Sequence, residues 1–356
     1  MDNSANMYQL YKKLLLEYFT GEVEPRMRVA QGENFLIQLV HQWNQYTIFA
    51  MLLNRAFSYV DRNYLRGNHM DTLGKFCQSE FKNRVIIGLE EQLQGAIIDQ
   101  LTRDRNEEHI NRDALKTAIQ VYVDLGREGE QKPMRSGNDF YWDGTPNLAY
   151  YEQQFEAKYL ELTRLTFRQK ANQWNSDCDC FSYLNEVDKA FVREEYNADF
   201  WLQAQTKPKM LEIVIKELVT DKAHAVVEKS PSGVLDFLKQ QELSKLQLLF
   251  NIFKRNPTTY EQIIDKMRPY IIDRGTSIVM NDENLKSPLD FTQKLLDFKR
   301  EVDIMVEQSF YNQIDFQKAR DNSFMEFMNE QMSTPTFMAQ YTDNMMQKTL
   351  KGKDDA

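Results

Sequence analysis

Few residues in this sequence have the types and spacing that catalysis or metal binding requires. Cys178 and Cys180 are one residue apart, whereas a reactive dithiol is usually spaced Cys-x-x-Cys and a structural zinc site takes four ligands. The four histidines are scattered along the chain, at His41, His69, His109 and His224. We therefore expect no metal site and no cofactor.

Two pairs of adjacent glutamates, Glu107-Glu108 and Glu194-Glu195, are candidates for acid–base chemistry. Adjacent side chains on a helix point in different directions, so the carboxylates of a pair do not converge on one substrate atom. The sequence also contains no glycine-rich phosphate loop, no Gly-x-Ser-x-Gly and no His-Glu-x-x-His. We interpret both pairs as solvated helical faces, and we expect no catalytic residue and no enzymatic activity.

Segment 36–64 offers a binding surface instead. Apolar residues recur there in a strict alternation of three and four positions, which predicts one helix of about 45 Å with a buried seam. The seam consists of Leu36, Leu39, Trp43, Tyr46, Ala50, Leu53, Phe57, Val60 and Tyr64. A second stripe, the 51–62 stripe, consists of Met51, Asn54, Arg55, Ser58, Tyr59 and Arg62. Methionine, arginine and aromatic residues are enriched in protein interfaces, although such a stripe can also pack against the next helix or face water.

Helical patterns separated by short breaks fill the rest of the chain. Only 13 glycines and 9 prolines occur in 356 residues, about half the average share of each, so turns are scarce. Further helices are expected over 76–101, 111–125, 181–205, 235–254, 260–280, and from Ser287 and Thr334 onward. Segment 126–147 carries four glycines and two prolines and is predicted to be a linker. Without a convincing strand pattern, the chain is predicted to be all-α.

The overall composition restricts the partners and the compartment. The chain has 53 acidic and 44 basic residues and a net charge of −9, which argues against a nucleic-acid partner. Three cysteines cannot build a disulfide framework, which fits a reducing compartment. No segment approaches the roughly 18 apolar residues of a membrane span, and the N-terminus has no signal-peptide pattern. We expect a cytoplasmic and/or nuclear protein that binds no membrane.

Several motifs resemble the N-terminal stalk of the cullins, the scaffolds of multisubunit ubiquitin ligases. The run Tyr59 to Arg62 is similar to the family's Tyr-Leu-Asp/Asn-Arg motif, and it follows Trp43 by 16 residues as the family pattern requires. Segment 151–163 is similar to the pattern Tyr-Glu-x-x-Phe-Glu-x-x-Phe/Tyr-Leu-x-x-Thr. The matches keep their order and spacing from about Leu10 to Lys348, and the resemblance leans towards the branch that uses F-box receptors.

The resemblance implies an all-α, elongated, solenoid-like stalk of three cullin repeats, each a bundle of about five helices. It places repeat 1 over 1–132, lacking its first one or two helices, repeat 2 over 148–257 and repeat 3 over 258–350. In the family, a C-terminal cullin homology domain binds the RING subunit and carries the lysine that receives a ubiquitin-like modifier. We expect this domain to be absent, because the sequence ends at Ala356.

The resemblance also implies a partner, a Skp-type adaptor that carries an F-box substrate receptor, as in an SCF complex. The 51–62 stripe is expected to face this adaptor, and the scaffold would hold substrate at a distance from the RING-bound end. Tyr8 and Tyr11 would add contacts if segment 8–14 is the early docking helix. Segment 10–13 nevertheless fits the third helix of the repeat better than the second, and half of the docking surface is then missing or remodelled. A tethering subunit of the exocyst type, or a truncated cullin that sequesters adaptors, are the alternatives.

Overall fold

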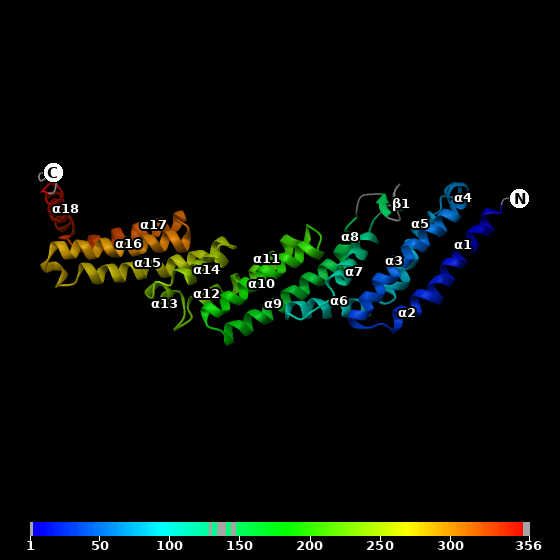
Figure 1. Ribbon diagram of the computed structural model, residues 1–356, viewed down its shortest axis with the longest axis horizontal. Helices are drawn as coiled ribbons and strands as arrows, with labels where there is room; N and C mark the ends of the chain where they lie inside the picture. The colour runs from blue at the N-terminus through cyan, green and yellow to red at the C-terminus, as the bar shows by residue number, and fades with distance from the viewer. Residues whose placement is uncertain (1–2, 128–129, 134–139, 144–146, 352–356) are drawn as a thin grey trace. The chain divides into compact units, whose positions relative to one another are not determined.

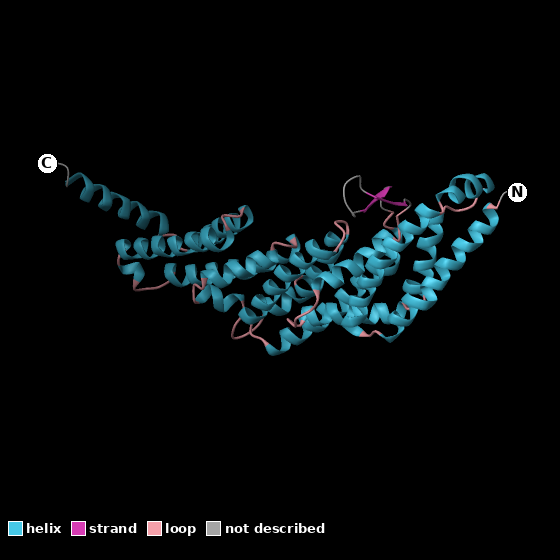
Figure 2. Cartoon of the chain, turned by 45° about the vertical axis from the view of Figure 1, so that its right-hand side comes forward, coloured by secondary structure: helices cyan, strands magenta, loops and turns pink. Residues whose placement is uncertain are grey.

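The structure, a computed structural model, describes residues 3–127, 130–133, 140–143 and 147–351. Almost every described element is a helix, and the described sheet has two strands (Figures 1 and 2). The predicted all-α class is therefore confirmed. Within the described ranges, every helix is too short or too polar to cross a lipid bilayer.

The elements follow one another along the chain as short and long helices, with π-helical and 3-10 turns labelled η. The first are α1 (Ser4–Tyr18), η1 (Phe19–Val23), α2 (Glu24–Val29), α3 (Gly32–Ala56), α4 (Ser58–Val60), η2 (Asp61–Leu65), η3 (Arg66–Asn68), α5 (Leu73–Phe81), η4 (Lys82–Ile87), α6 (Glu90–Arg105), α7 (Arg112–Asp124), β1 (Glu130–Pro133) and β2 (Phe140–Asp143). Then follow α8 (Ala149–Tyr151), η5 (Glu152–Glu156), α9 (Ala157–Asp177), α10 (Cys180–Trp201), α11 (Thr206–Leu218), η6 (Thr220–Lys222), α12 (Ala223–Val227), α13 (Val234–Lys239), α14 (Leu243–Phe253), α15 (Pro257–Val279), η7 (Asn284–Lys286), α16 (Pro288–Phe310), α17 (Ile314–Glu330) and α18 (Thr334–Lys351).

Contacts within the chain divide it into two compact units. Unit 1 comprises Met1–Leu162 and Tyr196–Lys209, and unit 2 comprises Thr163–Glu195 and Met210–Ala356. The division into three repeats over 1–132, 148–257 and 258–350 stays a prediction.

Helix α3 is the centre of unit 1 and packs against α5, α6 and α7. The first five members of the predicted seam, from Leu36 to Ala50, are buried as expected, and so is Val60. The Trp43 and Tyr46 rings lie 4.9 and 4.6 Å from the ring of Phe81, measured between centroids. The apolar residues that recur through segment 36–50 thus form the face of α3 that packs into the core.

The prediction of one uninterrupted helix over 36–64 is wrong. Helix α3 ends at Ala56, and Phe57 has φ −96° and ψ 14° before the chain continues as α4 and the π-helical turn η2. Two tertiary contacts accompany the break. The Phe57 ring meets the Tyr11 ring edge-on at 5.5 Å, and the Asp61 carboxylate accepts a hydrogen bond from the backbone N–H of Leu73 at 3.2 Å. Contacts with α1 and α5 therefore accompany the end of this helix. The spacing of apolar residues along the sequence gives no information on such contacts.

Other predicted helices agree with the structure to different degrees. Helices α7, α10 and α15 correspond to the segments predicted over 111–125, 181–205 and 260–280, and α16 and α18 begin next to Ser287 and at Thr334 as expected. The Ser287 hydroxyl caps α16 by accepting a hydrogen bond from the backbone N–H of Asp290 at 3.3 Å. Segment 76–101 is split between α5 and α6 by η4. Segment 235–254 is split into α13 and α14, and Gln241 in the break has a left-handed φ of 54°.

The predicted linker 126–147 contains a short antiparallel hairpin. Strand β1 pairs with β2 so that Glu130 lies opposite Asp143 and Pro133 opposite Phe140. Strands of four residues are too short for a period of two to stand out in a sequence rich in glycine and proline. Sequence patterns therefore detected the break between helices but not the hairpin within it.

A polar network joins α6, α7 and the portion of α10 that lies in unit 1. The Arg112 guanidinium donates hydrogen bonds to Asp104 Oδ1 at 2.9 Å and to Asn197 Oδ1 at 2.7 Å. The Asn197 amide in turn donates to Asp104 Oδ2 at 2.6 Å. The guanidinium also lies 4.7 Å from the Trp201 ring. Because Asp104 and Asn197 are buried, these bonds replace water that folding removes from both side chains.

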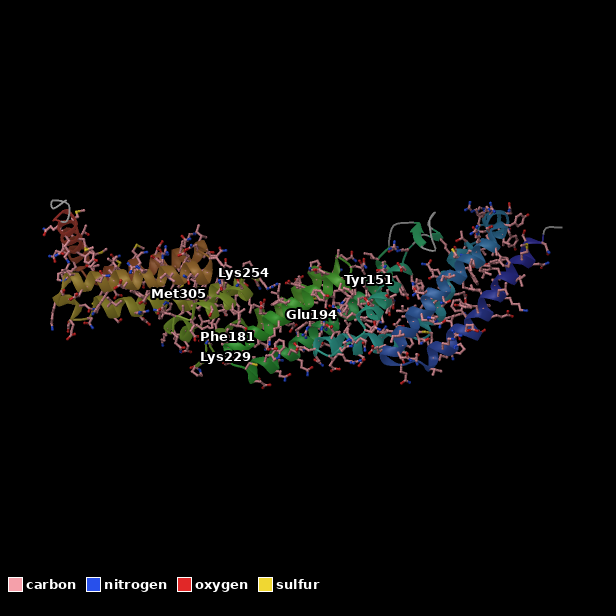
Figure 3. All side chains as sticks on the ribbon, viewed as in Figure 1. Tyr151, Phe181, Glu194, Lys229, Lys254 and Met305 are labelled. Carbon is pink, nitrogen blue, oxygen red and sulfur yellow. The ribbon has the colours of Figure 1, made fainter. Side chains whose placement is uncertain are left out.

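Helix α15 is central to unit 2 and packs closely on α17. Gly275 of α15 is buried, and a Cβ atom placed on it would collide with the ring of Phe327, which is also buried. The absence of a side chain at Gly275 therefore lets the two helices approach each other at this point. Met305 of α16 is another buried residue of this unit (Figure 3).

Candidate protein-binding surface

The 51–62 stripe occupies the end of α3, the short helix α4 and the start of η2. Arg55, Tyr59 and Arg62 are exposed, and the Tyr59 side chain is 54% accessible to solvent. Met51, Asn54 and Ser58 are half-buried. The same end of unit 1 contains α1, which contacts both α4 and η2 (Figure 1). The stripe thus combines exposed arginines and an exposed aromatic ring with partly buried neighbours.

Tyr11 lies beneath the stripe rather than on it. Its side chain is fully buried, and its hydroxyl oxygen lies 2.8 Å from Asn54 Oδ1, 2.9 Å from the carbonyl oxygen of Leu73 and 2.7 Å from Cys77 Sγ. These three partners belong to α3 and α5, so one hydroxyl connects three helices. The structure places Tyr11 in the core, where it holds Asn54 in position.

Burial determines the protonation of this cluster. It raises the pKa of the Tyr11 hydroxyl well above its ordinary value and raises the pKa of the Cys77 thiol to about 12. Both groups therefore keep their protons near neutral pH. Tyr11 can then donate to an oxygen of Asn54 or Leu73, while the Cys77 thiol donates to the Tyr11 oxygen.

Tyr8 is also largely buried. Its ring packs near three aromatic rings, those of Tyr11, Tyr64 and Phe76, at centroid distances of 6.5, 6.2 and 6.4 Å. The Lys12 ammonium lies 4.7 Å from the Tyr8 ring. Tyr8 and Tyr11, which were expected as additional contacts, therefore support the surface from below in this structure.

Helices α1 and α3 also expose apolar residues outside the predicted 51–62 stripe. Leu10 and Leu14 on α1 are exposed, as are Ile48 and Leu52 on α3. The two helices are neighbours, because the Tyr18 ring of α1 stacks on the α3 ring of Phe49 at 4.1 Å. Each exposed pair is spaced by four positions, a signal that was present in the sequence but lay outside the dominant seam. Leu52 lies three positions before Arg55, and exposed apolar side chains beside charged ones are typical of a protein-binding surface.

The other candidate sites offer less chemistry. Among the described residues, no group of three or more His, Cys, Asp or Glu side chains is arranged to hold a metal ion. Burial raises the pKa of the Cys180 thiol to about 12, which keeps it unreactive near neutral pH.

The solvated-face interpretation of Glu194-Glu195 is wrong for Glu194, which is buried along α10 (Figure 3). Its neighbour Glu195 forms an ion pair with Arg255 at 2.6 Å. One of the two carboxylates thus faces the core and the other an arginine, so the pair contributes to structure rather than to a solvated face. Sequence adjacency alone could not show which side of the helix would be covered.

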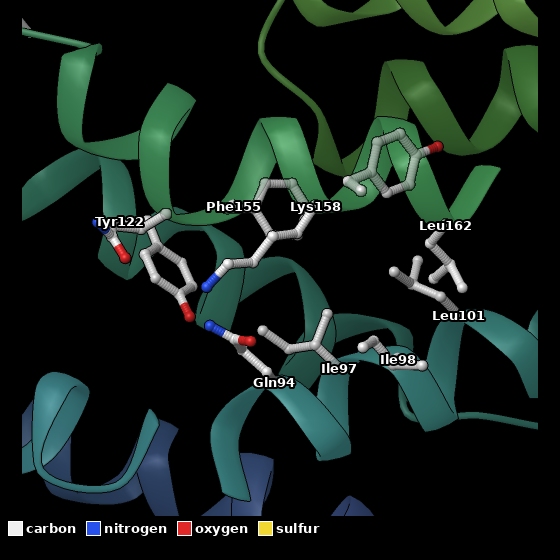
Figure 4. A pocket seen from close by; sticks show the side chains of 10 residues that line it. Gln94, Ile97, Ile98, Leu101, Tyr122, Phe155, Lys158 and Leu162 are labelled. Carbon is white, nitrogen blue, oxygen red and sulfur yellow. The ribbon is translucent and has the colours of Figure 1, made fainter. Parts of the chain in front are cut away.

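A small apolar cavity lies between α6, α7, η5 and α9 within unit 1 (Figure 4). Its volume is about 30 Å³, which is room for about one water molecule. Ile97, Phe155 and Leu162 are among the side chains that line it. A cavity of this size and lining does not accommodate a metabolite, so the exposed end of unit 1 is the better functional candidate.

Comparison with known proteins identifies the family. A family model described as the cullin alpha solenoid domain matches residues 1–356. The chain belongs to the cullin family. It is 24% identical to Cullin-3A of Arabidopsis thaliana over 331 residues, which cover 92% of this chain and 42% of the relative. It is 23% identical to Cullin-3 of Dictyostelium discoideum over 97% of this chain and 43% of the relative, and 24% identical to putative cullin-like protein 1 of Arabidopsis thaliana over 99% and 48%.

The family resemblance inferred from the motifs is thus confirmed over the whole sequence. This cullin chain spans less than half the length of the three curated relatives. Relatives named Cullin-3 and Cullin-2 both occur among the matches, so the family assignment does not select the F-box branch. The type of adaptor is accordingly a matter for proposal.

Proposed function

We propose that this cullin chain is a non-catalytic scaffold segment of a cullin-RING ubiquitin ligase and that the exposed end of unit 1 binds a substrate-receptor adaptor. The observation that carries the proposal is the exposure of Tyr59 together with Arg55 and Arg62, and of Leu52 three positions before Arg55. Scaffolding requires stable orientation rather than reactive groups. The RING subunit and the ubiquitin-like modifier would be reached through a C-terminal cullin homology domain.

The chemistry of the surface supports binding by a few anchor residues. Leu52 and Tyr59 are 56% and 54% accessible, so each has much apolar area left to bury against a partner. Burying a large apolar side chain contributes roughly 1.5–3 kcal/mol, and interface energy is usually concentrated in a few aromatic, arginine and aliphatic residues. The buried Tyr11 and Tyr8 beneath hold α1, α3 and α5 together, which reduces the ordering that binding must impose.

The more specific proposal is a Skp-type adaptor that carries an F-box receptor, as in an SCF complex. We expect the double variant Tyr59→Ala/Arg55→Glu to bind such an adaptor at least about tenfold more weakly, because it loses an aromatic anchor and reverses a charge. The helical circular dichroism should not change, since both side chains are exposed. A matched control is Met332→Ala/Arg300→Glu, which makes the same kind of change at exposed residues of unit 2.

The possible results distinguish three parts of the proposal: the binding site, the type of adaptor and the scaffold role. Unchanged binding by the Tyr59→Ala/Arg55→Glu variant would refute the site. Binding to a BTB-type adaptor, measured in parallel, with no binding to a Skp-type adaptor, would refute the F-box assignment but leave the scaffold role. A chain that binds neither adaptor, and instead sediments with liposomes, would favour the tethering alternative.

Two further parts of the proposal have their own tests. The alternative that this chain sequesters adaptors predicts that adding it to a reconstituted cullin-RING ligase lowers ubiquitin transfer in proportion to the adaptor that it binds. A cytoplasmic and/or nuclear location is proposed from the expected partners, and fluorescence microscopy of the tagged protein tests it.

A further inference from the structure

We infer that the adaptor face that meets this end of unit 1 is acidic and that it is recognised by an arginine stripe, defined as Arg55, Arg62 and Arg66. This inference rests on the proposed function and adds to it the chemistry of the partner. It also adds Arg66, which the 51–62 stripe did not include.

The three arginines lie on one side of a helical run. Arg62 follows Arg55 by seven positions, about two helical turns, and Arg66 follows Arg62 by four. The run is interrupted at Phe57 and resumes in right-handed helical backbone through α4, η2 and η3, where both Asp61 and Arg66 are helical. The exposed ring of Tyr59 lies four positions after Arg55 and three before Arg62. Basic and aromatic groups therefore share one exposed face.

None of these three guanidinium groups forms an ion pair with another residue that the structure describes. Arg62 Nε donates a hydrogen bond to the carbonyl oxygen of Ser58 at 3.3 Å, which leaves its positive charge uncompensated. The carboxylate next in sequence, Asp61, accepts from the backbone N–H of Leu73 at the first turn of α5. Its charge is thereby directed to the N-terminus of that helix, where a carboxylate is favourable.

Other arginines of unit 1 have carboxylate partners. Arg84 pairs with Glu24 at 2.9 Å and with Glu80 at 2.7 Å. Arg103 pairs with Glu33 at 3.3 Å and with a second glutamate on the following loop. In a chain whose net charge is −9, three neighbouring arginines without such partners are a local departure from the general pattern. An acidic surface on a partner would complement the positive charge of these three arginines.

The composition of the face favours a protein over a polyanion. Leu52 and Tyr59 expose apolar area beside the arginines, and such area is buried by a folded partner rather than by phosphates. Three charges are also few for nucleic-acid binding, which depends on many phosphate contacts, and the net charge of −9 would oppose it. An acidic protein surface with apolar patches fits both properties of the face.

The test measures association kinetics of the whole chain with a purified Skp-type adaptor bound to its F-box receptor, at low and high salt. Complementary rim charges act mainly on the association rate, and salt screens them. We expect the wild-type association rate to fall about tenfold from low to high salt. Arg66→Glu should lower it about tenfold at low salt and much less at high salt. Arg28→Glu is the matched control, because Arg28 is exposed in the same unit but pairs with Glu24.

Each result has one meaning. An association rate that does not depend on salt and is unaffected by Arg66→Glu would refute the inference while leaving adaptor binding, and so the proposed function, intact. Failure to bind the Skp-type adaptor at either salt concentration, with no binding to a BTB-type adaptor measured in parallel, would refute the proposed function and this inference with it. Equal or tighter binding to an oligonucleotide or to anionic phospholipid vesicles would overturn the choice of an acidic protein. Thermal unfolding of Arg66→Glu should match the wild type, since the residue is exposed.

Discussion

Replacing Tyr11 with phenylalanine removes one hydroxyl and leaves the buried ring in place. That hydroxyl lies within 2.7–2.9 Å of Asn54 Oδ1, the carbonyl oxygen of Leu73 and Cys77 Sγ. It has one proton to donate, and the protonated Cys77 thiol can donate to it, so two hydrogen bonds are lost together. At about 0.5–1.5 kcal/mol for each bond, we expect the free energy of unfolding to fall by about 1–3 kcal/mol.

Tyr18→Phe is the matched control on the same helix. The Tyr18 hydroxyl makes no hydrogen bond with any residue that the structure describes, and the ring is half-buried against Phe49. We expect this change to alter the free energy of unfolding by less than about 0.5 kcal/mol. Urea denaturation followed by circular dichroism measures both variants at neutral pH, where Tyr11 and Cys77 carry their protons.

Hydrogen exchange shows where the effect of Tyr11→Phe lies. Because the hydroxyl joins α1 to α3 and α5, amide protection should fall in these helices of unit 1 and remain unchanged in α15 and α17 of unit 2. The reasoning is refuted if Tyr11→Phe and Tyr18→Phe have equal effects on stability. It is also refuted if the loss of protection is spread evenly over the chain.

Three further changes test other parts of the structure. Because burial raises the pKa of the Cys77 thiol to about 12, above its unfolded value of about 8.5–9, the folded state holds this proton more tightly. The protonated Cys77 thiol therefore makes its full contribution to the free energy of unfolding below about pH 8.5, and this contribution declines as pH rises towards about 12. Between about pH 9 and 10.5, the free energy of unfolding of the wild type, measured in urea titrations, should fall by about 1–2 kcal/mol more than that of Cys77→Ala. Gly275→Ala should lower the free energy of unfolding, measured by urea denaturation, by about 1–3 kcal/mol, because the new Cβ meets the ring of Phe327. Gly95→Ala is the control: this helical position has no neighbour around its Cβ, so the change should raise the free energy of unfolding slightly. Arg112→Lys keeps the charge but loses the two-pronged hydrogen bonding, and it should destabilise unit 1 by about 2 kcal/mol in the same measurement; a change below about 0.5 kcal/mol would contradict this role.

Much of the helical architecture could be predicted from local patterns. The spacing of Leu36 to Ala50 identified the buried face of α3, and Ser287 before a proline identified the start of α16. These features are predictable because helix periodicity and capping depend on residues within a few positions of one another. The order and spacing of the motifs from about Leu10 to Lys348 likewise sufficed to suggest the family, which the match over residues 1–356 confirmed.

The candidate surface was only partly predictable. Arg55, Tyr59 and Arg62 are exposed as a binding role requires, but Tyr8 and Tyr11 are in the core. The regular alternation of segment 36–64 gave no sign of the break at Phe57, because that break accompanies contacts with α1 and α5, distant in sequence. The exposure of Leu10 and Leu52 could not be predicted for a similar reason, because leucine in a helix is normally expected to be buried.

The sequence by itself therefore determined the class of fold, the positions of most helices and the family. Only the tertiary structure decided which side chains remain available to a partner. The spacing of residues along a helix predicts which of them share a face. Whether that face is buried depends on helices from elsewhere in the chain that pack against it. Tyr11 illustrates this difference, since its hydroxyl meets Asn54 and Cys77, 43 and 66 positions away, and becomes an internal connection instead of a contact.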